Sequence, residues 1–219
     1  MRTSGLCLIL ALSLARLGTV MAIERPVAIQ PEIAAPDTRT WDEVMKGLGH
    51  ENFFIRTSAY FALSGIGGDE ALAALAGRLK TDHSTSRVIV VDALNNMGDK
   101  RAGDAELAFL DPAKESKEFC QHCLIGMRNY QVKEAAPKII PMLLDDAELT
   151  RTWAANYFEV CPDSGAADGL AAALARQSNL NITYSVTEYL KKAALPDEKR
   201  QQLTNALKKY GKQEMPAQP

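Results

Sequence analysis

Apolar residues recur along the chain at a spacing that fits one face of a helix. Counted from Arg56, positions 3, 6, 7 and 10 are Ala59, Ala62, Leu63 and Ile66. Residues at these separations lie on the same side of an α-helix, so the pattern predicts an amphipathic helix. A mainly apolar version of the same spacing starts at four further anchors: Arg87, Cys120, Arg151 and Thr183. The five anchors follow one another at intervals of 31, 33, 31 and 32 residues, which indicates a repeated unit.

Each predicted helix is followed by a short break and a second apolar stripe. Glycine or proline marks the break in four units, whereas Gln131-Val132 stands there in the third. The stripe of the first unit has the i, i+4, i+8 spacing of one helix face: Ala71, Leu75 and Leu79. In the second unit Glu106 falls on the stripe, and we expect the neighbouring Leu107 to take its place in the core.

These units predict an all-α fold, a right-handed α-α superhelix of about five helix pairs. A two-helix unit of this length cannot bury its own apolar face, so neighbouring units must stack. The predicted repeat domain covers residues 40–212, with a tail at 213–219. Thr40 and Glu43 form a capping-box pattern that opens a short helix, Trp41–Leu48, ahead of the first unit. The units lie near residues 51–81, 82–114, 115–145, 146–177 and 178–211.

The first unit resembles the HEAT repeat, in particular the short bacterial form also found in phycobilisome-lyase-like proteins. The resemblance rests on Ile55-Arg56, Ala62-Leu63 and Ile66-Gly67 within Glu51–Leu79, and on Glu134–Leu144, which resembles the second helix of that repeat. It implies the HEAT-like solenoid described above. It does not imply one function, because such repeats serve as scaffolds for many purposes.

In HEAT repeats an acid and the anchor arginine form a ladder between adjacent units. An acid stands five residues before the anchor in four units here: Glu51, Asp82, Glu115 and Asp146. The resemblance therefore implies a structural ladder built on Arg56, Arg87, Arg151, Asp82 and Asp146. Cys120 and Thr183 replace the arginine, so we expect the ladder to be broken at units three and five. A basic strip for an anionic ligand is the alternative role of the three arginines.

The N-terminus has the order of a secretory signal. One arginine precedes the apolar run Leu6–Ala15, and Ala22 offers a small residue for cleavage, so residues 1–22 are predicted to be a signal peptide. A membrane span needs about 20 apolar residues, and Arg16 ends this run too early. We expect a periplasmic or secreted protein with no stable membrane span after cleavage; a buried N-terminal helix is the alternative. Prolines predict an extended linker over residues 23–39.

Composition narrows the classes of partner. The chain of 219 residues has a net charge of −2, and cleavage after Ala22 removes two arginines and no acid, which leaves −4. A mildly acidic chain is a poor nucleic-acid binder, because clustered cations supply most of that affinity. The 47% apolar and 24% charged residues are typical of a globular protein.

The cysteines offer the one local motif that could carry chemistry. Cys120-Gln121-His122-Cys123 lacks the histidine that haem attachment needs after the second cysteine, and the chain shows no βαβ context for thioredoxin-like chemistry. Because Cys123 and Cys161 occupy core positions of the repeat, we expect buried structural cysteines. A disulfide in the export compartment, or a redox or metal role, is the alternative. The sequence predicts no catalytic, cofactor-binding or metal-binding residue.

The leading functional prediction is a non-catalytic scaffold that binds another protein along the row of second helices. Trp153 could equally be a binding anchor or pack under the loop between units three and four. An enzyme accessory subunit or lyase-like protein is the first alternative, and a thiol-redox module through Cys120 and Cys123 is the second. The candidate contact residues are Arg78, Lys138, Trp153 and Arg176.

Overall fold

The computed structural model describes residues 38–176 and 179–211, and every regular element in this part of the chain is a helix. The predicted signal peptide, most of the predicted linker and the predicted tail lie outside the described residues. The helices are α1 (Trp41–Leu48), α2 (Phe53–Ile66), α3 (Gly68–Thr81), α4 (Ser84–Asn96), α5 (Lys100–Leu107), α6 (Lys117–Asn129), α7 (Ala136–Ile139), α8 (Glu148–Val160), α9 (Ala167–Arg176), α10 (Leu180–Lys192) and α11 (Asp197–Tyr210), with short 3-10 helices η1 (Lys133–Ala135), η2 (Ile140–Leu144) and η3 (Ser164–Ala166).

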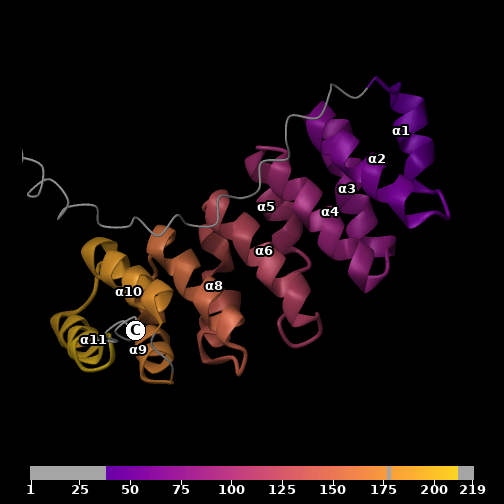
Figure 1. Ribbon diagram of the computed structural model, residues 1–219. Coiled ribbons are helices and arrows are strands. Elements are labelled where there is room, and N and C mark those ends of the chain that lie inside the picture. The colour runs from indigo at the N-terminus through magenta and orange to yellow at the C-terminus, as the bar shows by residue number, and fades with distance from the viewer. Residues whose placement is uncertain (1–37, 177–178, 212–219) are drawn as a thin grey trace, which may run out of the picture. The chain divides into compact units, whose positions relative to one another are not determined.

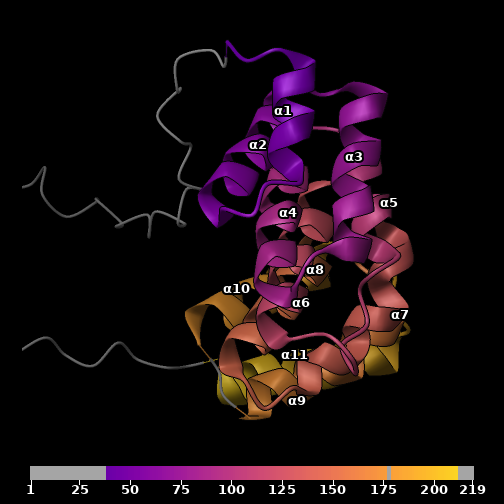
Figure 2. The ribbon, with the colours of Figure 1, turned by 90° about the vertical axis from the view of Figure 1, so that its right-hand side faces the viewer.

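The helices form stacked pairs in two rows (Figure 1). In the row of first helices α2, α4, α6, α8 and α10 each contact the next one along the chain. In the row of second helices α5 contacts α3, and α9 contacts both η2 and α11. Figure 2 shows α3, α5 and α7 to one side of α2 and α4. The prediction of an all-α, solenoid-like stack of five helix pairs is confirmed for the described residues.

The predicted apolar stripes form the core between the rows. Leu75, Ile139 and Leu170, which share one position of the repeat, are all fully buried. The N-terminal helix α1 packs against α2 and has the capping box predicted from the sequence. Its Thr40 backbone N–H donates to Glu43 Oε2 at 2.7 Å, which satisfies an amide that the helix cannot pair.

The third unit departs from the regular pattern because of its prolines. Its second helix is divided into η1, α7 and η2, since Pro141 has no backbone N–H to continue an α-helix. The stripe residues Ala135, Ile139 and Leu143 remain fully buried in spite of this break. The turn before them also differs from the glycine turns, because Gln131 takes the left-handed conformation with φ 54°.

Two buried tyrosines tie the fourth and fifth units to the turn of the unit before them. Tyr157 and Tyr189 both stand six residues after their anchor, on α8 and α10. The Tyr157 hydroxyl donates to the carbonyl of Val132 at 2.8 Å, and the Tyr189 hydroxyl donates to the carbonyl of Asp163 at 2.6 Å. Each bond crosses from one unit to the next, so it fixes the distance between neighbouring pairs.

We predict that Tyr157→Phe lowers the free energy of unfolding by about 1 kcal/mol, because it removes this bond while keeping the ring. Tyr184→Phe is the matched control, since its ring is 47% exposed and surface changes of this size have effects within about 0.5 kcal/mol. Urea denaturation of the three proteins gives the comparison. Equal stability of the two variants would show that the inter-unit bond contributes nothing.

Candidate functional site

The three cations predicted to contact a partner all make bonds within the chain. Arg78, in the last turn of α3, pairs with Asp82, the residue that directly follows this helix. Lys138 Nζ donates to the carbonyl of Leu107 at 2.9 Å, and Arg176 pairs with Asp146. Partner contacts at these residues stay predictions, but a partner would have to compete with bonds that already exist.

Similar bonds run along the row of second helices. Arg101 on α5 lies 2.6 Å from Asp69 on α3, and Lys199 on α11 lies 2.6 Å from Asp168 on α9. These pairs are largely exposed, so each adds little stability by itself. They also engage charges that a partner could otherwise bind.

The predicted ladder arginines occupy two kinds of environment. Arg87 donates from its two terminal nitrogens, Nη1 and Nη2, to the carboxylate of Glu115 in the next unit, at 2.7 and 3.0 Å. This is the contact that a ladder between adjacent units requires. Arg56 and Arg151 share another contact, in which Nη1 donates to the backbone carbonyls five and six residues earlier. These two arginines therefore hold the loop that enters their own helix.

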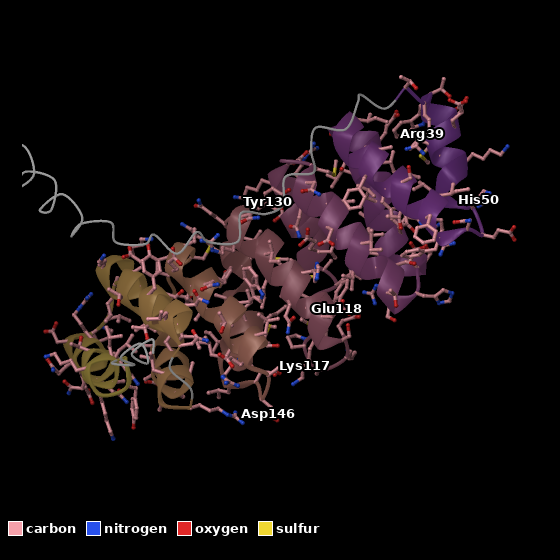
Figure 3. All side chains as sticks on the ribbon, in the orientation of Figure 1. Arg39, His50, Lys117, Glu118, Tyr130 and Asp146 are labelled. Carbon is pink, nitrogen blue, oxygen red and sulfur yellow. The ribbon has the colours of Figure 1, made fainter. Side chains whose placement is uncertain are left out.

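The carboxylates of the two acids of the predicted ladder bond to side chains of other elements. Asp82 is bonded by the Tyr60 hydroxyl and by Arg78, both from the first unit. Asp146 lies in the loop between η2 and α8, as Figure 3 shows, and its partner Arg176 comes from the end of α9. The carboxylates thus link elements, Asp82 through Arg78 and Asp146 through Arg176, whereas Arg151 bonds the backbone carbonyl of Asp146.

Trp153 is half-buried on α8 and packs against the hydrophobic core. Its position favours a packing role over that of a free anchor. A surface hollow lies between the N-terminal ends of α8 and α10, and Thr152, the residue before Trp153, lines it. Asn179 crosses this hollow by donating to Glu148 Oε1 at 2.9 Å and to Thr152 Oγ1 at 3.0 Å, so the hollow is a polar tie between two first helices.

The three described cysteines are free and buried, which removes the thiolate that redox chemistry needs. Burial, assisted by the charge of Glu115, raises the pKa of Cys120 to about 11. Burial also raises the pKa of Cys123 well above its usual value, and that of Cys161. These thiols are therefore protonated and packed in the core near neutral pH, and the structure gives no support to a thiol-redox role for Cys120 and Cys123.

The outer face of α2 carries large apolar side chains that no described helix covers. Phe54 is 78% exposed, Ile66 is 50% exposed, and Ile55 and Phe61 are each close to 40% exposed. Phe54 and Phe61, seven residues apart, lie on one side of the helix, and Ile55 and Ile66 flank them near its two ends. We call the surface of these four residues the α2 face. The spacing after Arg56 predicts that Ile66 lies in the core with Ala59, Ala62 and Leu63. That placement is wrong, because α2 ends at this residue and the chain turns away at Gly67.

A signal for the α2 face was present in the repeat itself. Phe61 stands five residues after its anchor, and the corresponding residues of three other units are Asp92, Asn156 and Glu188. The position is therefore polar and partly buried in three units and carries an exposed aromatic residue in the first.

Comparison with known proteins shows a likeness of fold only. No family model matches the chain, and no curated protein matches it. Among solved structures, a chain of the complex of CpcE and CpcF of phycocyanin lyase from Nostoc sp. PCC7120 is similar at 18% identity, over 76% of this chain and 73% of that chain, with a TM-score of 0.47. At this level the likeness says nothing of activity.

Two features are absent from the described part of the chain. No group of three or more histidine, cysteine, aspartate or glutamate side chains there is arranged to hold a metal ion. No helix there is long and apolar enough to cross a membrane.

We predict that the native cysteines react slowly with Ellman's reagent. With a pKa near 11, the Cys120 thiol is ionised in only about one molecule in a thousand at pH 8. All three thiols of the chain that begins after Ala22 should react quickly once guanidinium unfolds the protein. Fast reaction of Cys120 or Cys123 in the folded protein would restore the thiol-redox hypothesis.

Proposed function

We propose that this protein is a non-catalytic scaffold that binds another protein through the α2 face. The observation that supports the proposal is the exposure of four large apolar side chains on a single helix, two of them phenylalanines on the same side. Contiguous apolar surface on a soluble protein is typical of a protein-binding site. Aromatic residues such as Phe54 and Phe61 are also enriched at the centre of protein interfaces.

The stack explains how such a surface can be both exposed and ordered. The buried side of α2 contributes Ala59, Tyr60 and Leu63 to the core, so the helix is held rigidly from behind. A partner therefore meets preformed side chains and loses little entropy in ordering them. A helix of 14 residues is about 21 Å long, so the partner must also touch neighbouring elements to reach an ordinary interface area. The helix α1 packs against α2 and is one such neighbour, and its Met45 is 36% exposed.

Binding along the second helices is the alternative location. We rank it below the α2 face because Arg78, Lys138 and Arg176 already bond within the chain. The enzyme-accessory role suggested by the HEAT-like resemblance is a different hypothesis, and a small covalent adduct on the isolated protein would support it.

We also propose that the protein acts in the periplasm or outside the cell. This rests on the charged start, the apolar run Leu6–Ala15 and the small residue Ala22. The mass of the chain recovered from its own host tests the proposal directly, since cleavage removes residues 1–22. A chain that retains Met1–Ala22 would contradict it.

We predict that the double variant Phe54→Glu, Phe61→Glu loses its partner protein. Two charges on the α2 face would have to be desolvated on binding, and the loss of an interface anchor commonly costs at least about 2 kcal/mol, which is roughly a thirtyfold loss of affinity. The measurement is native mass spectrometry of the tagged protein captured from its host.

The matched control is Leu149→Glu, Leu180→Glu. These leucines are 54% and 48% exposed on the first helices α8 and α10, so the control adds the same charge to the same row. It should keep the partner, and circular dichroism should show both variants folded. Retention of the partner by the α2 variant would exclude the α2 face, and loss only in Arg78→Glu, Arg176→Glu would place the site on the second helices.

A further inference from the structure

The junction of the second and third units contains a buried carboxyl group. Glu106, near the end of α5, is fully buried. It occupies the stripe position that Leu75, Ile139 and Leu170 fill elsewhere with apolar side chains. The expectation that Leu107 would replace it in the core is wrong: Leu107 is only partly buried, and Glu106 itself points inward.

Three hydrogen-bond acceptors meet at this place without a donor in the described part of the chain. They are both carboxyl oxygens of Glu106 and the side-chain oxygen of Asn95 on α4. The Asn95 amide nitrogen donates to the carbonyl of His122 at 3.2 Å, so its oxygen is the atom left facing the junction. Buried acceptors without donors are costly, and a group that supplies one donor here would remove much of that cost.

Gly126 on α6 shows that the two side chains share one small space. A Cβ atom at Gly126 would overlap both Asn95 Oδ1 and Glu106 Oε2, so these oxygens lie against the same backbone atom. Gly126 stands six residues after its anchor, at the position that holds Tyr157 and Tyr189 in later units. Gly126 thus has no side chain where the later units have a tyrosine ring, and the carboxyl group of Glu106 and the amide group of Asn95 lie against it instead.

The surroundings of Glu106 give its carboxylate no counter-charge. On α4, Asp92 faces the junction and is bonded to His122 Nδ1 of α6 at 2.5 Å. From α6 come the Cys123 thiol and, at its C-terminal end, Tyr130, whose hydroxyl donates to the carbonyls of Leu94 and Asn95 at 2.8 Å. Tyr130 is labelled in Figure 3. Two further neighbours contribute charges that are bonded elsewhere: Asp69 of α3 pairs with Arg101 at the exposed surface, and Lys138 of α7 donates to the carbonyl of Leu107 at 2.9 Å.

Burial, and after it the negative charge of Asp92, raises the pKa of Glu106 well above its usual value of 4.5. The geometry leads to the same result independently, because a proton on Glu106 is the donor that the three acceptors lack.

We propose that Glu106 is protonated in the folded protein, that its O–H donates a hydrogen bond to Asn95 Oδ1, and that removing this proton loosens the junction of α4, α5 and α6. This junction joins the first two units, which carry the α2 face, to the three units that follow. A proton therefore controls how firmly the two parts of the stack are joined.

The sign of the pH dependence follows from the raised pKa. Above pH 4.5 the unfolded chain has lost the Glu106 proton, whereas the folded chain keeps it. The stability contributed by the neutral junction is thus complete below that pH and is lost as the pH rises toward the folded-state pKa. At pH 7 the folded protein should hold about one more proton at this site than the unfolded protein.

The test compares the wild-type protein with Glu106→Gln, whose amide can donate to Asn95 Oδ1 at every pH. We expect the unfolding midpoint of the wild type to fall more steeply between pH 5 and pH 9 than that of Glu106→Gln, by the slope of about one proton. Glu70→Gln, at an exposed position on α3, is the control and should keep the wild-type slope. Parallel pH profiles for all three proteins would overturn the proposal.

Infrared spectroscopy provides a second readout that needs no unfolding. The wild type at pH 7 should show the carbonyl stretch of a protonated carboxylic acid, and this band should be absent from Glu106→Gln. A wild-type spectrum without the band would show that Glu106 is ionised and would reject the proposal even if the variant failed to fold.

Discussion

Each helix pair in this protein has an apolar side that it cannot cover by itself. Leu75, Ile139 and Leu170 are fully buried only because the rows of helices on both sides of them are stacked. Hydrophobic burial supplies the stability but does not set the distance between units, because it has no direction. The hydroxyls of Tyr157 and Tyr189, each bonded to a carbonyl of the preceding turn, add that direction. The positions of all surface residues depend on this stack.

The periodic part of the structure could be predicted from the sequence because it is set within single helices. The spacing after each anchor identifies helix pairs, and Thr40 with Glu43 identifies the start of α1. What could not be predicted depends on neighbours. The burial of Glu106 requires the gap at Gly126 on another helix, and the exposure of Ile66 depends on which helices reach the end of α2.

The candidate contact residues also show the difference between features set within one helix and features that depend on neighbouring elements. Arg78 and Arg176 were predicted to contact a partner. Asp82 lies one helical turn after Arg78, so that pair could have been read from the sequence, whereas Asp146 lies thirty residues before Arg176 and comes within reach only in the folded chain. These two cations are therefore already paired within the chain, while the α2 face keeps apolar surface that no described helix covers. The first unit thus differs from the others in the exposed apolar side chains of α2. The second unit differs at its junction with the third, where the buried Glu106 replaces an apolar residue of the stripe.

Site-specific photo-crosslinking in the living host tests the central claim most directly. A photoreactive amino acid would replace Phe54 in one strain and Asn181 in another, since Asn181 is exposed at the same position of the fifth unit. We expect a covalent adduct with one other protein from position 54 and none from position 181. An adduct from position 181 alone, or from neither position, would contradict the account of α2 as the binding face.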